Sequence, residues 1–217
     1  MPRGTAANQA LNYPGEEVVQ VPSFGGGPPP PPSPEPPVSN ARVGMVMLIG
    51  AETMLFTGLI GAYVMFRFGS VAWPSAHLYL PVGVTWVNTF VLLLSCYTMR
   101  QAITAVQAND RRGLVHRLSV TGLLGTTFLS IQGYEWTQLI RDGLTISTGI
   151  YGATFYTLIG CHALHVLAAV TWLLIVVWQA RKGRFSQRRH VGVEICSMYW
   201  YYVGALWVVL FVLVYLN

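Results

Sequence analysis

The sequence predicts an all-α, polytopic integral membrane protein that crosses the bilayer with five transmembrane helices. The chain has 217 residues, of which 53% are hydrophobic and only 10% are charged, and its mean hydropathy is +0.48. Soluble domains carry about 25% charged residues, so this chain has little polar surface to offer water. Its apolar residues also gather in five segments, each long enough to cross the hydrocarbon core, which takes about 20 helical residues.

The segment before the first apolar run, residues 1–40, forms a separate zone rich in proline. Residues 25–34 read GGGPPPPPSP. Such a composition buries too little apolar surface to offset the entropy cost of ordering, so we expect a disordered cytoplasmic tail. Docking of this tail onto a partner is the less favoured alternative. Residues 41–217 are expected to form the transmembrane domain.

The five expected spans follow one another along the rest of the chain. They are Val43–Phe66, Tyr79–Met99, Leu118–Ile140, Gly149–Trp178 and Val191–Leu216. In lipid, each segment must satisfy its own backbone hydrogen bonds, and segments of this length favour helices over barrel strands. The fourth is longer than a bilayer requires, which predicts a tilted helix or a protruding end.

The charges between the spans predict the orientation. The second and fourth connections are basic and hold Arg100, Arg111, Arg112, Arg117, Arg181, Lys182, Arg184, Arg188 and Arg189. The first and third hold only Arg67 and Arg141. The positive-inside rule therefore predicts a cytoplasmic N-terminus and a periplasmic C-terminus. These clusters also account for the net charge of +5 without a nucleic-acid partner.

Ionisable residues inside the spans are the candidate functional groups. They are Glu52 in the first span, Glu135 in the third, His162 and His165 in the fourth, and Glu194 near the inner end of the fifth. A charge at membrane depth costs on the order of 3 kcal/mol, so such residues suggest a proton-handling or lipid-contacting role. For Glu52, a neutral carboxyl that bonds a neighbouring helix is an equally weighted alternative.

A metal site is not expected among these residues. Of the five histidines, only His162 and His165 lie deep in a span, and one face of one helix cannot supply both axial ligands of a haem. We expect these histidines to pack between helices, or to donate to Glu135 or a backbone carbonyl. Glu194 is expected to meet water or the Arg188/Arg189 cluster. No catalytic residue is predicted.

Small and polar residues suggest how the helices pack. Gly50, Gly58 and Gly61 share one helical face, which lets another helix approach closely. Glu52 points roughly away from that face, toward a second neighbour, a cleft or lipid. Asn88 is expected to form a hydrogen bond between helices. The aromatic stripe that includes Tyr199, Trp200, Tyr201, Tyr202 and Trp207 is expected to be packing rather than a cofactor box.

Five motifs occur in order along the spans. They are GAETMLFTGLIGAY at 50–63, VNTFVLLLSCYTM at 87–99, QGYEWTQLI at 132–140, YGATFYTLIGCHALHV at 151–166 and GVEICSMYWYYVGALW at 192–207. Together they make residues 42–217 resemble subunit III of heme–copper terminal oxidases, in its five-helix form. The last motif departs from the family pattern, because Tyr201 stands in place of a histidine and Gly204 in place of an aspartate.

The resemblance implies a non-catalytic subunit of a respiratory oxygen reductase in a bacterial inner membrane. It implies that haem and copper lie in partner subunits, that the chain packs on catalytic subunit I in a complex with subunit II, and that it binds phospholipid and supports proton uptake. Glu52 would be the family's buried glutamate, facing a lipid cleft and the catalytic subunit. The tail is a candidate for contacts in a larger respiratory supercomplex.

Three alternatives compete with this interpretation. One is a subunit-III-like accessory protein of a nitric oxide reductase, and another is a subunit of a quinol oxidase. The third is a stand-alone transporter, which five spans without an inverted repeat disfavour.

Overall fold

The computed structural model describes residues 39–69, 82–187 and 189–216. Within these ranges the elements are α1 (Asn40–Gly69), α2 (Val82–Gln107), α3 (Arg111–Arg141), the short 3-10 helix η1 (Ile146–Thr148), α4 (Ile150–Arg181) and α5 (Val191–Tyr215). All five α-helices are long and apolar enough to cross a membrane. The prediction of an all-α protein with five transmembrane helices is therefore confirmed. The proline-rich tail lies outside the described residues, and its disorder stays a prediction.

The second connection is much shorter than the hydropathy pattern predicted. Helix α2 runs on to Gln107 and α3 already begins at Arg111, so Arg100 and Arg117 lie within helices rather than in a loop. Hydropathy marks only the part of a helix that faces hydrocarbon, whereas the backbone hydrogen bonds continue into the headgroup region. Residues 79–81, the expected start of the second span, lie outside the described residues.

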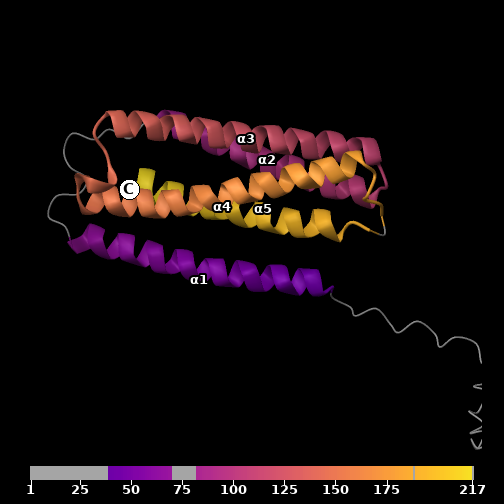
Figure 1. Ribbon diagram of the computed structural model, residues 1–217, viewed down its shortest axis with the longest axis horizontal. Helices are drawn as coiled ribbons and strands as arrows, with labels where there is room; N and C mark the ends of the chain where they lie inside the picture. The colour runs from indigo at the N-terminus through magenta and orange to yellow at the C-terminus, as the bar shows by residue number, and fades with distance from the viewer. Residues whose placement is uncertain (1–38, 70–81, 188, 217) are drawn as a thin grey trace, which may run out of the picture. The chain divides into compact units, whose positions relative to one another are not determined.

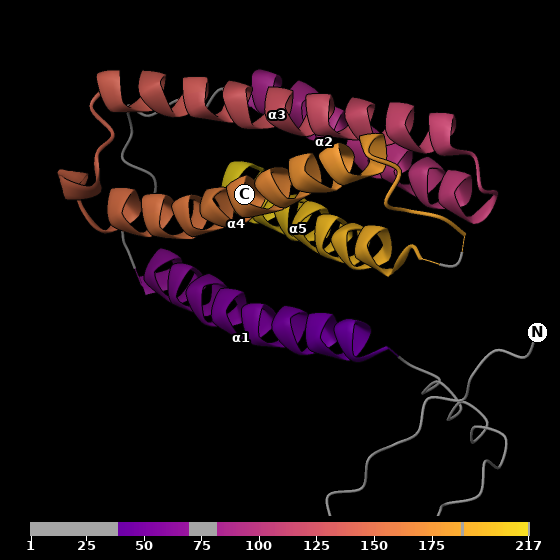
Figure 2. The same ribbon diagram turned by 45° about the vertical axis from the view of Figure 1, so that its right-hand side comes forward.

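The helices form three layers in Figures 1 and 2, with α2 and α3 in one, α4 and α5 in the next, and α1 beyond them. Accordingly, α1 contacts α4 and α5 but has no contacts of comparable extent with α2 or α3. In Figure 1 the start of α1 and the α2–α3 and α4–α5 connections lie at one end of the bundle, and the C-terminus lies at the other. This alternation fits five successive passes through a bilayer.

Two tryptophans of α5 fill the centre of the bundle. Trp200 is 1% exposed and Trp207 is fully buried. The indole Nε1 of Trp200 donates to Ser95 Oγ at 3.1 Å, and that of Trp207 donates to Thr89 Oγ1 at 3.0 Å. Both acceptors lie on α2, so each large ring packs in the core while its polar N–H is satisfied. The α2–α5 contact is thus both apolar and hydrogen-bonded.

Two glycines make this packing sterically feasible. A Cβ added to Gly125 of α3 would overlap the Trp200 ring, and a Cβ added to Gly204 of α5 would lie 2.9 Å from Cys96 Sγ on α2. Gly204 is the position where the family pattern has an aspartate. Here its lack of a side chain lets α5 lie close against α2. Tyr201, the other position that differs from the family pattern, is 36% exposed.

Replacing Gly125 by alanine should destabilise the protein by about 1–3 kcal/mol, because the added methyl group overpacks the Trp200 site. Gly133→Ala is the matched control on the same helix, since nothing lies within 4 Å of its added Cβ. Both changes gain the same helix propensity, so the difference in thermal unfolding midpoint isolates the overlap. Equal midpoints for the two variants would contradict this account of the core.

Candidate functional site

Glu52 lies on α1 and points toward α4 and α5. Its side chain is only 12% exposed. Tyr199 of α5 donates its hydroxyl to Glu52 Oε1 at 3.1 Å, and His165 Nε2 of α4 lies 3.9 Å from the same oxygen. The other carboxyl oxygen, Oε2, is buried without a partner in the described part of the chain. Glu52 therefore joins three helices through one oxygen and leaves the second unused.

The tautomer of His165 follows from its second contact. His165 Nδ1 lies 2.7 Å from the backbone oxygen of Cys161. A carbonyl oxygen only accepts hydrogen bonds, so Nδ1 carries a proton and donates it to this oxygen, while Nε2 faces Glu52. The Nε2–Oε1 distance of 3.9 Å is longer than a hydrogen bond, so the two groups are neighbours without a direct bond.

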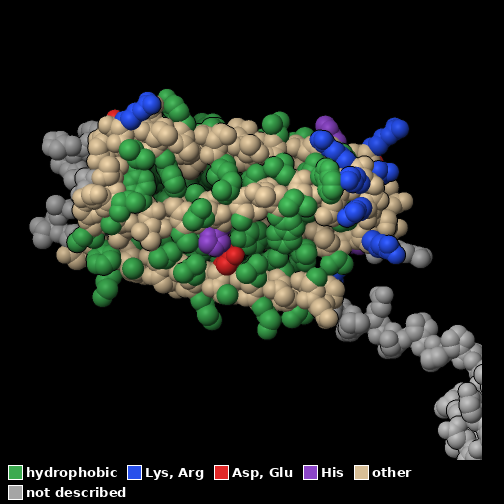
Figure 3. All heavy atoms as spheres, viewed as in Figure 1, with side chains coloured by type: hydrophobic (Ala, Val, Ile, Leu, Met, Phe, Trp, Pro, Cys, Tyr) green, Lys and Arg blue, Asp and Glu red, His purple; other side chains and the backbone are tan. Residues whose placement is uncertain are grey.

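With one proton between its two facing groups, this pair would carry no net charge. With the proton on Glu52, the carboxyl and the imidazole are both uncharged; with the proton on His165 Nε2, an anion faces a cation. The net charge is zero in both arrangements, which suits an apolar setting better than a lone charge does. Figure 3 shows an acidic and a histidine side chain side by side among hydrophobic side chains, over α1 and α4.

His162 lies deeper than His165 and differs in its surroundings. It is 1% exposed, and neither ring nitrogen has a hydrogen-bond partner among the described residues. Its ring stacks on Trp207 with centroids 5.5 Å apart and meets the edge of Phe56 at 6.2 Å. His162 therefore packs as an aromatic ring between α1 and α5, as expected for a helix-packing histidine.

Glu135 belongs to a second buried polar cluster, formed by α2, α3 and α5. Its carboxylate accepts from Thr85 Oγ1 at 3.1 Å and from Gln132 Nε2 at 3.0 Å. Gln132 Nε2 also lies 3.3 Å from the hydroxyl of Tyr215. Of the two acceptors we expected for the histidines, Glu135 or a backbone carbonyl, the structure shows the carbonyl: His165 Nδ1 lies 2.7 Å from the backbone oxygen of Cys161, whereas a hydroxyl and an amide bond Glu135.

Asn88 extends the same cluster along α2. It is fully buried, and its Nδ2 donates to the backbone oxygen of Phe128 at 3.1 Å and to Gln132 Oε1 at 3.4 Å. One amide thus bonds both the backbone and a side chain of α3. Hydrogen bonds between membrane helices contribute roughly 0.6 kcal/mol each. The cluster therefore adds modest stability, and its main effect is to fix how α2 and α3 are aligned.

Glu194 links the beginnings of α1 and α5. Arg42 donates to Glu194 Oε2 through Nε at 3.0 Å and through Nη2 at 2.6 Å, while His190 Nε2 lies 3.0 Å from Oε1. We expected water or the Arg188/Arg189 cluster here; Arg188 lies outside the described residues, and the partners observed are Arg42 and His190. The ion pair therefore holds the start of α1 against α5.

The glycine face of α1 has no neighbour among the described helices. Gly50, Gly58 and Gly61 are exposed, and nothing in the described chain lies within 4 Å of a Cβ added at any of them. Only Met45, Phe56 and Tyr63 of this helix are buried. The packing of a helix on these glycines therefore stays a prediction.

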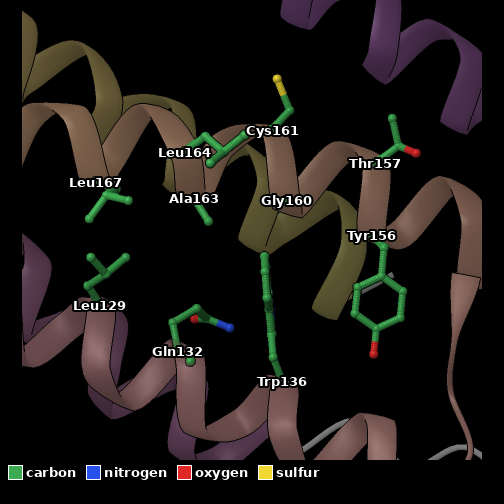
Figure 4. Close-up of a pocket in the computed structure, with 11 residues that line it drawn as sticks. Leu129, Gln132, Trp136, Tyr156, Thr157, Gly160, Cys161, Ala163, Leu164 and Leu167 are labelled. Atoms are coloured by element: carbon green, nitrogen blue, oxygen red, sulfur yellow. The ribbon is translucent and has the colours of Figure 1, made fainter.

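An apolar groove of about 670 Å³ lies between α3 and α4. Figure 4 shows Leu129 and Leu167 facing each other across it, with Trp136 standing between the helices and Tyr156 at the far end. This lining makes the groove a space for apolar groups.

Among the described residues, no three His, Cys, Asp or Glu side chains gather in a way that would hold a metal ion.

The sequence model of the family described as cytochrome c oxidase subunit III matches residues 37–217. The chain belongs to the cytochrome c oxidase subunit III family. The resemblance seen in the five motifs is thereby confirmed. It covers all five transmembrane helices and begins just before α1.

Individual members of the subunit III family agree with this match. The cytochrome c oxidase subunit 3 of Synechocystis sp. is 37% identical over 179 residues, which are 80% of this chain and 74% of the relative. That of Thermostichus vulcanus is 30% identical over 175 residues, 80% of this chain and 86% of the relative. That of Corynebacterium diphtheriae is 32% identical over 176 residues, with the same two shares.

Three of the subunit III motifs meet at one place in the fold. GAETMLF of α1 supplies Glu52, the motif of α4 supplies His165, and the motif of α5 supplies Tyr199. Glu135 and Glu194 lie in separate clusters with partners of their own. Sequence reasoning missed Tyr199, which was assigned to packing. The available signal was a phenol hydroxyl in an apolar span, which needs a partner when buried.

The Arg42–Glu194 pair should show a measurable coupling. In a double-mutant cycle, Arg42→Gln and Glu194→Gln together should lose less unfolding free energy than the sum of the two single losses. The difference should be about 1 kcal/mol or less, because Arg42 is partly exposed and water weakens the ion pair. Arg184→Gln with Glu194→Gln is the control pair and should be additive. If the losses of unfolding free energy were additive in both cycles, the ion pair would not stabilise the attachment of α1.

Proposed function

We propose that this chain is a non-catalytic subunit of a respiratory heme–copper oxygen reductase of the cytochrome c oxidase type, acting in aerobic electron transport in a bacterial inner membrane. The observation that carries the proposal is the family match over residues 37–217. Haem and copper are assigned to partner subunits, and catalysis to the whole complex. The relatives named above are all cytochrome c oxidase subunits, which does not favour a nitric oxide reductase accessory or a quinol oxidase.

The contact with catalytic subunit I is assigned to the exposed face of α1. This face combines Gly50, Gly58 and Gly61, which permit close helix approach, with Met47 and Met54, which are 72% and 80% exposed. Methionine adapts its shape to a partner surface. Glu52 faces α4 and α5 instead, so its contribution to the partner contact would be indirect, through the position of α1. Subunit II is assigned to the same complex, and no surface of this chain is assigned to it.

Orientation follows from the basic residues at one end of the bundle. The α2–α3 and α4–α5 connections share that end (Figure 1), and Lys and Arg side chains gather there (Figure 3). The positive-inside rule supports a cytoplasmic position for this end, with the N-terminal tail on the same side and the C-terminus in the periplasm.

Support for proton uptake is assigned to Glu52 and His165. The pair is neutral with one proton on either partner, and Oε2 of Glu52 has no bond to break among the described residues. Such a pair can hold a proton at membrane depth without a net charge. Phospholipid binding is assigned to the groove between α3 and α4, where Leu164 is 67% and Leu167 is 49% exposed and an acyl chain would find an apolar lining.

Purification of the tagged chain in mild detergent tests the assignment to an oxidase. Haem, copper and a cytochrome c oxidase activity should accompany it, and mass spectrometry should identify subunits I and II. A preparation that contains non-haem iron and reduces nitric oxide instead of oxygen would overturn the proposal.

Glu52→Gln should leave the initial rate of oxygen reduction nearly unchanged, because no redox centre is lost. It should reduce the number of turnovers before inactivation, measured in an oxygen electrode, or the amount of phospholipid retained. Tyr199→Phe is the matched control, since it removes the hydrogen bond to Oε1 but keeps the carboxyl group. If both variants lost the same number of turnovers, the role of Glu52 would be limited to its hydrogen bond between α1 and α5. Immediate loss of activity in an assembled complex would contradict the proposal.

A further inference from the structure

A second cavity, of about 650 Å³, lies where α3 begins and α4 ends. Its lining is strongly basic and consists of Arg111, Arg112, Val115, His116 and Ser119 of α3 together with Arg181 of α4. It lies at the end of the bundle where Lys and Arg side chains gather in Figure 3, and it is separate from the Glu52 cluster and from the apolar groove. We refer to it as the basic pocket.

Two of the guanidinium groups in the basic pocket are held in position by the protein. Arg111 Nη2 donates to the backbone oxygen of Arg181 at 2.9 Å, and Arg181 Nη2 lies 3.4 Å from Ser119 Oγ. A guanidinium has five N–H donors in a fixed plane, so each of these two side chains keeps donors for a ligand. Arg112 is exposed and has no hydrogen-bond partner in the described part of the chain.

The positive charge of the basic pocket is not balanced by carboxylates. Within the described residues, no carboxylate lies at salt-bridge distance from Arg111, Arg112 or Arg181. The acidic residue next in sequence, Asp110, accepts from the backbone N–H of Gly113 at 2.9 Å and caps α3. Three clustered guanidiniums without counter-charges favour an anion, and guanidinium groups fit phosphate in a bidentate manner.

An apolar surface continues from the pocket along the same two helices. Leu123 of α3, one helical turn beyond Ser119, is 69% exposed. On α4, Leu174 and Trp178 are 51% and 53% exposed. Gly122 sits beneath Leu174, whose Cδ2 would lie 3.5 Å from an added Cβ, so the two helices meet closely along this seam. A ligand with an anionic head and hydrocarbon chains matches both parts of the surface.

We infer that the basic pocket binds the phosphate headgroup of an anionic phospholipid, whose acyl chains lie along the Leu123–Leu174–Trp178 surface of α3 and α4. Basic pockets between transmembrane helices at the cytoplasmic side suit anionic lipid headgroups. This inference deepens the lipid-binding part of the proposed function and rests on that proposal for the identity of the complex. The apolar groove near Trp136 takes no part in headgroup recognition.

Lipid titration of the purified complex tests the inference. The complex is stripped of lipid in detergent, titrated with phosphatidylglycerol, and the bound lipid is counted by native mass spectrometry. The variants are Arg112→Gln, whose side chain bonds nothing described and should not disturb folding, and the double variant Arg111→Gln/Arg181→Gln. Arg184→Gln is the control, because it removes the same charge at the same end of the bundle but does not line the pocket.

Arg112→Gln should weaken phosphatidylglycerol binding roughly fivefold, and the double variant about 25-fold, which corresponds to ~1 kcal/mol for each basic residue near the surface. Arg184→Gln should stay within about twofold of the unaltered chain, since its charge is outside the pocket. Unchanged binding in both pocket variants, equal binding of phosphatidylcholine, or displacement of the lipid by millimolar inorganic phosphate would each overturn the inference.

The haem and copper content of each preparation is measured beside the lipid count, which separates the two proposals. Loss of lipid from a fully assembled oxidase concerns the basic pocket alone. Absence of haem and copper from a chain that still binds phosphatidylglycerol would refute the proposed complex and leave the lipid site standing.

Discussion

Within hydrocarbon, a buried polar group has no water to bond, and this constraint shapes the packing of the bundle. The polar side chains between α2, α3 and α5 therefore find one another. Trp200 donates to Ser95 and Trp207 donates to Thr89, while Glu135 accepts from Thr85 and Gln132. Each bond adds little energy, but a mismatched register would leave several polar groups unpaired. The polar bonds thus specify which helix faces are in contact.

Helix α1 is attached with far less burial. Three of its residues are buried, namely Met45, Phe56 and Tyr63, and polar links join it to α4 and α5 at three places along its length. Arg42 binds Glu194 at one end, Glu52 meets Tyr199 and His165 in the middle, and Arg67 Nη1 lies 3.5 Å from the backbone oxygen of Leu213 toward the other end. This arrangement leaves the opposite face of α1 for lipid or another chain, as a subunit of a larger assembly requires.

Polar side chains at three positions along the bundle differ in their partners and surroundings. Arginines gather at one end of the bundle, and three of them line the basic pocket there. Glu52 and His165 lie near the middle of apolar helices, with His165 Nε2 3.9 Å from Glu52 Oε1. In the Glu135 cluster, the carboxylate accepts from Thr85 and Gln132, and Gln132 Nε2 also lies near the Tyr215 hydroxyl, so the cluster links α2, α3 and α5. A carboxylate's depth and partners, more than its identity, therefore separate a structural role from a candidate functional one.

The sequence by itself determined the five spans, the polar residues at membrane depth and the family, because hydropathy and motif order are local properties of the chain. It misjudged the ends of α2 and α3, since helical hydrogen bonding continues beyond the hydrocarbon-facing residues. Only the tertiary structure decided that Glu52 meets Tyr199 and His165, that Glu135 bonds Thr85, and that Arg42 binds Glu194. The physical reason is that each helix holds an apolar stretch long enough to cross a membrane, and in lipid both its buried and its outward side can be apolar, so a hydrophobic face does not mark which neighbour it meets. That choice rests on shape, as where Gly125 admits Trp200, and on polar partners distant in sequence.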